Sequence, residues 1–211
     1  MACVSCKSEK TEGENPFFSA WETPYGVPPF DKIRAEHFLP ALERGMSLHD
    51  AEIDAIASNN DDPTFGNVIE AYDVAGGMLA RTELVFGMLC AAENTPELQA
   101  LQERAMPLLA AHYDRILLDE RLFARVKELY DRRGALDLDD VQLRLLEKTY
   151  RRFVRAGALL DAGRKARLKE INGELALAAV KFGNNLLAEN NRFEMELTAD
   201  EMAGLPSDVQ E

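Results

Sequence analysis

A helical spacing of apolar residues runs from residue 35 to residue 190 of this 211-residue chain, and it constrains the fold more than any other feature. In the first stretch, residues 35–58, Phe38, Leu42 and Ile53 recur at helical intervals, so one face of that helix should be buried. Short turn sequences such as "NNDDPT" separate the stretches. The sequence therefore predicts an all-α fold of about six helices, in antiparallel hairpins or a bundle. The later helices are expected over residues 65–92, 95–117, 120–133, 138–157 and 162–190.

Single residues predict three helix starts and one position of low helix propensity inside a helical stretch. Thr95, Asp137 and Asp161 each precede a helical stretch and can cap it by accepting a hydrogen bond from a backbone amide. Gly76–Gly77 lies in the middle of the 65–92 stretch, where each glycine lowers helix propensity by about 1 kcal/mol. Glycines at such a position favour the close approach of another helix.

The last helix carries a nearly continuous apolar stripe. Its members follow an alternating spacing of three and four residues: Leu168, Ile171, Leu175, Ala178, Phe182 and Leu186. This spacing is typical of the contact between two packed helices. We therefore expect the stripe to form the seam of a helical hairpin, and residues 35–191 to form one helical domain.

Residues 15–34, "NPFFSAWETPYGVPPFDKIR", predict an extended arm, because proline fixes φ and disfavours helix in the residue before it. The arm is rich in aromatic residues, namely Phe17, Phe18, Trp21, Tyr25 and Phe30. So many aromatic rings would be poorly placed in water, and they should lie on an apolar surface. We interpret the arm as a structural clamp that docks the first helix.

Residues 192–198, "RFEMELT", alternate apolar and polar side chains, and this period of two predicts a short terminal β-strand. A single strand leaves its backbone edges unpaired. We therefore interpret residues 192–211 as a strand followed by the start of a truncated segment, and the chain as part of a longer protein.

Residues 1–14 form a polar tail with no pattern of core residues. Cys3 and Cys6 make a C-x-x-C pair there, but neither a strand-to-helix context nor a second pair supports a redox or zinc role. Two interpretations remain open. The tail is the tether of a lipoprotein in the cell envelope or periplasm, with Cys3 or Cys6 as the anchor, or the protein is cytoplasmic. Cys90 has apolar helical neighbours and is expected in the core.

The formal net charge is −13, and long runs of lysine and arginine are missing. Nucleic acid is therefore excluded as the main partner, since binding of phosphates needs a basic surface. A basic cluster on one helix, Lys148, Arg151, Arg152 and Arg155, is expected to be a solvated face, with contact to an acidic partner as the alternative. The chain lacks the roughly 20 consecutive apolar residues of a membrane span, so we predict no transmembrane segment.

The three histidines do not form a catalytic or metal-binding motif. Helical zinc sites of peptidases use two ligands four residues apart with a glutamate between them. His49 and Glu52 match part of the inverted pattern H-x-x-E-H, but Ile53 occupies the last position. We expect His49 to face solvent, and His37 and His112 to be satisfied by nearby carboxylate or backbone groups. The sequence predicts no catalytic residue, no metal ligand and no cofactor in this chain.

Four segments resemble a known family: "WETPYGVPPFDKIRAEHFLPALERGM", "AEIDAIASNNDDPTFGNVI", "LLEKTYRRFVRAGALL" and "ARLKEINGELALAAVKFGNNLLAE". In this order they are similar to the amino-terminal region of the thimet-oligopeptidase family, and most similar to its bacterial peptidyl-dipeptidase and oligopeptidase A branch. The resemblance implies a mostly helical zinc metallopeptidase whose two lobes flank a channel and which cleaves short peptides. The family's H-E-x-x-H motif and downstream glutamate belong to the carboxy-terminal part, and this chain contains neither.

Two functions are consistent with these observations. In the first, the chain is a non-catalytic helical domain of a zinc-dependent oligopeptidase, with the carboxy-terminal catalytic region and short peptides as its partners. It then forms part of the wall of the substrate channel, and the zinc belongs to the full-length protein. In the second, the chain is a stand-alone helical module that binds a protein or peptide through the same apolar faces.

Overall fold

The computed structural model describes residues 15–198 and 201–206. A π-helical stretch, Phe65–Glu70, precedes the short helix α2 (Ala71–Val74), and single 3-10 turns occur at Pro16–Phe18, Pro24–Gly26 and Arg133–Ala135. The prediction of an all-α fold is confirmed. The longer helices are α1 (Ala35–Ala57), α3 (Gly77–Ala92), α4 (Pro96–Leu117), α5 (Glu120–Asp131), α6 (Asp140–Arg155) and α7 (Ala162–Arg192).

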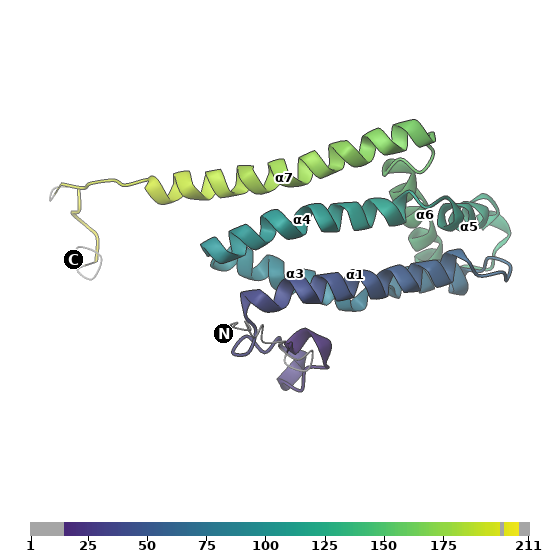
Figure 1. The fold of residues 1–211 in the computed structure, drawn as a ribbon, viewed down its shortest axis with the longest axis horizontal. Coiled ribbons are helices and arrows are strands. Elements are labelled where there is room, and N and C mark those ends of the chain that lie inside the picture. Colours follow the sequence, from purple (N-terminus) through teal and green to yellow (C-terminus); the bar gives the residue numbers. More distant parts are fainter. Residues whose placement is uncertain (1–14, 199–200, 207–211) are drawn as a thin grey trace, which may run out of the picture.

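Four of these helices run side by side with alternating directions, and α5 and α6 lie at one end of the four (Figure 1). Helix α4 is central, since it contacts α1 on one side and α7 on the other. Helix α1 also packs along α3. Helix α7 is the longest, and its carboxyl end reaches past the beginning of α4 (Figure 1).

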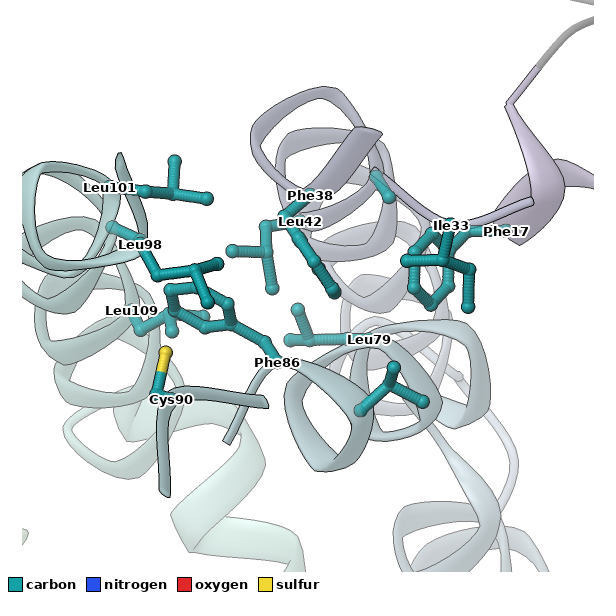
Figure 2. Close-up of a cluster of buried hydrophobic side chains, with 13 residues drawn as sticks. Phe17, Ile33, Phe38, Leu42, Leu79, Phe86, Cys90, Leu98, Leu101 and Leu109 are labelled. Carbon is teal, nitrogen blue, oxygen red and sulfur yellow. The ribbon is translucent and has the colours of Figure 1, made fainter. Parts of the chain in front are cut away.

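Two clusters of buried apolar side chains hold the helices together. In the first, the Phe38 ring of α1 lies 5.2 Å from the ring of Phe17 and 5.1 Å from that of Phe86, so the arm, α1 and α3 meet there (Figure 2). The second joins the far end of α1 to α5 and α6, around Leu122 and Phe153. Each buried large side chain contributes about 1.5–3 kcal/mol of hydrophobic stabilisation, so the two clusters dominate the stability of the bundle.

The stretch predicted as one helix over residues 65–92 is broken in the middle, and that prediction was wrong. Ala75 is extended, and Gly76 adopts a left-handed conformation with φ of 78°. The Gly76 backbone amide donates a hydrogen bond to Oε2 of Glu52 on α1, at 2.7 Å. A Cβ atom at Gly76 would lie 2.9 Å from Nδ1 of His49, so the expected close approach of another helix does occur at this glycine.

The same stretch bears on the question of a membrane span. Over Phe65–Ala92 the mean hydropathy of one 18-residue window reaches 1.4, so length and composition alone would permit a span, and 33% of that window is buried inside the fold. In the fold, however, the stretch bends at Gly76, and Ile69 and Leu79 on its two sides are fully buried in the two clusters. Part of its apolar character therefore serves the core of the bundle, while Leu84 and Met88 in the same stretch are exposed. That the chain has no transmembrane segment stays a prediction.

The helix caps are mostly as expected. Thr95 caps α4 and Asp161 caps α7, each by accepting a backbone hydrogen bond through its side chain. The cap of α6 is Asp139 and not Asp137, because the Asp139 carboxylate accepts from the amide of Gln142 at 2.8 Å in a reciprocal capping box.

The predicted strand over residues 192–198 is absent. Helix α7 extends to Arg192, and residues 193–198 have no regular secondary structure. A strand needs a neighbour to pair with its backbone, and the part of the chain described here supplies none. Phe193 and Met195 are exposed as a result.

The arm docks near both of its ends, around Phe17 and again at Pro29 and Ile33, which are buried. Phe17 is completely buried, and the indole nitrogen of Trp21 donates to the carbonyl of Pro16 at 2.8 Å. Arg81 of α3 donates to the Phe17 carbonyl at 2.8 Å and lies 4.7 Å from the Trp21 ring centre, so it ties the arm to the bundle. The expectation of a docked arm is wrong for Tyr25 and Phe30, which are exposed.

The apolar stripe of the last helix, predicted to form the seam of a helical hairpin, does not face α4. Leu175, Phe182 and Leu186 are 59%, 70% and 52% exposed. Helix α7 instead turns a different face toward α4, on which Asn172 donates to Asp114 of α4 at 2.7 Å. The hairpin of α4 and α7 therefore exists, but the larger apolar stripe of α7 is left uncovered in this chain.

Candidate functional site

Two histidines that are 63 residues apart in sequence meet in the interior. Nδ1 of His49 on α1 lies 3.0 Å from Nε2 of His112 on α4, and both side chains are buried. Both lie on the apolar faces of their helices, which is why they face each other: His49 is seven residues after Leu42, and His112 is three after Leu109.

The polar groups around this pair determine which of its ring nitrogens carry a proton. Arginine only donates hydrogen bonds, so the Arg115 guanidinium, 3.0 Å from Nδ1 of His112, makes that nitrogen an acceptor. The proton of neutral His112 then lies on Nε2, which donates to Nδ1 of His49. Asp50 approaches His112 Nδ1 at 3.3 Å and pairs with Arg115 at the surface.

A second hydrogen-bonded pair lies beside the histidines. The Tyr113 hydroxyl donates to Oε2 of Glu83 at 2.6 Å, and the Tyr113 ring lies edge-on to both imidazoles. Burial raises the pKa of Glu83, while the hydrogen bond from Tyr113 opposes that change. Burial also raises the pKa of Tyr113, so its hydroxyl stays protonated and continues to donate.

Burial lowers the pKa of both histidines below 6.5 because it penalises the charged imidazolium. The carboxylates of Asp50 and Glu52 oppose this change at His49, where Arg152 of α6 reinforces it. At His112, Asp50 opposes the change, and His49 and Arg115 reinforce it. The pair is therefore held neutral in the folded state.

This pair predicts a pH dependence of stability. A histidine whose pKa is lower in the folded state binds its proton more readily when unfolded. The free energy of unfolding should thus be highest above pH 6.5 and should fall as the pH drops below 6.5. Urea unfolding measured between pH 5 and pH 8 checks this expectation.

Two variants sharpen the test. His112→Gln removes one partner of the buried pair and should flatten the slope below pH 6.5. His37→Gln is the matched control, because glutamine is a favoured capping-box residue and the pair is untouched. An equally steep slope in the His112→Gln variant would contradict the assignment.

The pair is not arranged as a zinc site. Within the described ranges, no three histidine, cysteine, aspartate or glutamate side chains lie close enough together to hold a metal ion. Each imidazole uses a ring nitrogen to bond the other, and Glu52, the residue that suggested a metal motif, accepts from Gly76 instead. These groups fix the α2–α3 break against α1 and α4.

The other sequence-based expectations for polar residues had mixed outcomes. Nδ1 of His37 accepts from the Arg34 amide at 3.0 Å, as expected of a histidine near a helix start. His112 is satisfied by Arg115 and His49, and not by the nearby carboxylate of Asp50 as was expected. The expectation of a solvent-facing His49 was also wrong. The signal that could have identified its burial is its place on the apolar face of α1.

Two further groups have structural roles. Burial raises the pKa of the Cys90 thiol to about 11, so this core cysteine is a poor nucleophile at neutral pH. The basic cluster is exposed, and Arg151 in it pairs with Glu147 at 2.8 Å, as expected of a solvated helix face. The possible anchors Cys3 and Cys6 lie outside the described residues.

Comparison with known proteins links the chain to peptidases. No family model matches it. It is 42% identical over 176 residues to dipeptidyl carboxypeptidase of Escherichia coli, an alignment that covers 83% of this chain and 26% of the relative. It is 25% identical to oligopeptidase A of the same organism, over 87% of the chain and 27% of the relative. It is 26% identical to an organellar oligopeptidase A of Arabidopsis thaliana, over 96% of the chain and 25% of the relative.

The chain thus spans about a quarter of the length of these relatives. The resemblance that its sequence segments suggested is confirmed. The chain is homologous to the amino-terminal region of dipeptidyl carboxypeptidase and oligopeptidase A, which are members of the thimet-oligopeptidase family.

Proposed function

We propose that this chain is the non-catalytic amino-terminal domain of a zinc-dependent oligopeptidase of the peptidyl-dipeptidase type. The observation that carries the proposal is the 42% identity to dipeptidyl carboxypeptidase, over most of this chain but only 26% of the relative. The remaining three quarters would supply the catalytic groups. The buried histidines agree with this division, because both are engaged within the bundle.

The proposed role of the domain is to form part of the wall of the peptide channel. Long helices packed side by side make a stiff wall, and α1, α3, α4 and α7 run in this way (Figure 1). We also propose that residues 35–191 fold as one domain, since α1 contributes Phe38 to one core cluster and Ile53 to the other. The domain would then restrict which peptides reach the catalytic region without taking part in the chemistry.

Zinc in this proposal belongs to the whole protein. Bound zinc polarises a peptide carbonyl and activates water. The described residues do not fit a zinc site, because they lack a cluster of three ligands, so the metal would be held outside the described part of this chain.

Of the two locations considered, the cytoplasm is the better supported. One relative, from Arabidopsis thaliana, is named a probable cytosolic oligopeptidase A and is 26% identical over 94% of this chain. We therefore propose a cytoplasmic peptidase, and the lipoprotein tether at Cys3 or Cys6 as the alternative.

The test compares the full-length gene product with residues 1–211 alone. The full-length protein should release dipeptides from the carboxyl end of a short peptide and should contain zinc, whereas residues 1–211 should do neither. Mass spectrometry of the products and elemental analysis of untagged protein measure the two properties. Hydrolysis by residues 1–211, or one tightly bound zinc per chain, would overturn the proposal.

The stand-alone interaction module remains the second candidate, because α3 and α7 both expose large apolar side chains. The gene sequence separates the two candidates. A downstream H-E-x-x-H favours the peptidase, and a stop codon after residue 211 favours the module.

A further inference from the structure

A groove of about 750 Å³ lies between the second halves of α3 and α7, with the first half of α4 along it. Glu93 is the only charged residue among those that line it. Small residues of both helices, such as Gly87 and Ala91 on α3 and Ala179 and Gly183 on α7, make the groove wide enough for another element.

Large apolar side chains continue from the groove onto the surface. Leu84 and Met88 share one face of α3 with Gly87 and Ala91, and are 70% and 56% exposed. On α7, the exposed Phe182 lies on a different face from the residues that line the groove, such as Gly183 and Leu187, so it is not part of this surface. An uncovered apolar surface of this kind is rare on a soluble monomer and marks a contact with another element.

Few charged residues interrupt the apolar surface of α3 and α7. From Ile171 to Ala188, α7 carries only two charged residues, Glu174 and Lys181. On α3 the charged residues are engaged elsewhere, since Arg81 donates to the arm and Glu83 accepts from Tyr113. A helix that is apolar on nearly all sides is normally buried, and in this chain α3 and α7 are each covered on one side only.

One polar atom of the groove also lacks a partner. The side-chain oxygen of Asn94, at the junction of α3 and α4, is buried and accepts no hydrogen bond. A buried unpaired acceptor costs about 1–3 kcal/mol, so an occupant that donates a hydrogen bond there is favoured.

We propose that this groove, together with Leu84 and Met88, is the docking surface for an apolar-faced helix of the polypeptide that its longer relatives carry beyond the matched quarter. This inference rests on the proposed function, because it takes its occupant from the rest of the peptidase. Two observations favour that occupant. The relatives are about four times as long as the aligned segment, and α7 leads out of the bundle at Asn191, which lines the groove. A second copy of the chain is disfavoured, since each copy carries a net charge of −13.

The experiment is hydroxyl-radical footprinting of the full-length gene product and of residues 1–211, read at Leu84, Met88 and Tyr25. Docking should reduce the modification rates of Leu84 and Met88 by about fivefold or more in the full-length protein, because the centre of such a contact is fully desolvated. Tyr25 is fully exposed in the arm, away from the groove, and serves as the internal control.

A pair of variants gives an independent measurement. Leu84→Glu should lower the melting temperature of the full-length protein, and should leave that of residues 1–211 unchanged because the side chain is exposed there. Val141→Glu, at an exposed site of α6, is the matched control and should have no effect in either protein.

Unchanged reactivity of Leu84 and Met88 in the full-length protein would overturn the docking proposal, even if that protein hydrolyses peptides. Protection of these residues in residues 1–211 alone, rising with concentration and accompanied by dimers in sedimentation, would assign the groove to a second copy and would also overturn it. Loss of the proposed function alone would instead appear as failure of the full-length protein to hydrolyse peptides.

Discussion

Replacing Phe17 by alanine should lower the free energy of unfolding by about 3–5 kcal/mol, the usual cost of removing a fully buried phenylalanine. Phe17 has no exposed surface, and its ring packs against Phe38 at 5.2 Å and Trp21 at 5.9 Å. The variant should also loosen the arm, because Arg81 holds the Phe17 carbonyl next to the Trp21 ring. Urea unfolding followed by circular dichroism measures the first effect.

Trp21 is the only tryptophan, so its fluorescence reports on the arm alone. In the native protein its emission should shift to longer wavelength together with the loss of helix, and in Phe17→Ala it should already be shifted before unfolding. Tyr25→Ala is the control, since Tyr25 lies in the same arm but is fully exposed, and its loss should leave stability nearly unchanged. Equal stability of the two variants would mean that the arm does not contribute to the core.

The sequence predicted the helices well where an apolar face and a capping residue agree. For α1, α4 and α7 the spacing of apolar residues and the caps Thr95 and Asp161 set the boundaries within a few residues. Both signals are local, because a helix satisfies most of its hydrogen bonds within its own segment. Local signals failed at residues 193–198, where an alternating pattern needs a partner strand that the described residues do not provide.

Tertiary packing decided the features that the sequence pattern could not predict. Helix α7 has apolar residues on more than one side, so its periodicity alone could not select which face contacts α4. The pairing of His49 with His112 likewise depends on how α1 and α4 align, and one histidine on an apolar face predicts burial but not its partner. The H-E-x-x-H spacing is missing from the sequence itself, and that no residue of this chain takes part in catalysis stays a prediction.

Replacing Gly76 by alanine should destabilise the protein by about 2–4 kcal/mol, from two effects that add. The first is backbone strain, since φ of Gly76 is 78° and residues with a Cβ atom rarely adopt that conformation. The second is a clash, because the new Cβ atom would lie 2.9 Å from Nδ1 of His49, whose ring is held by His112. Thermal or urea unfolding gives the size of the effect.

The neighbouring glycine is the matched control. A Cβ atom at Gly77 would meet nothing within 4 Å, and the residue begins α3, so Gly77→Ala should leave stability unchanged or raise it by up to about 1 kcal/mol. The double variant His49→Ala with Gly76→Ala separates the two effects, because removing the imidazole removes the clash and leaves the strain. Its loss of stability should therefore be smaller than the sum of the two single losses. If Gly76→Ala proved as stable as Gly77→Ala, the break between α2 and α3 would not be fixed by its contact with His49, and the buried histidines would have no part in shaping the bundle.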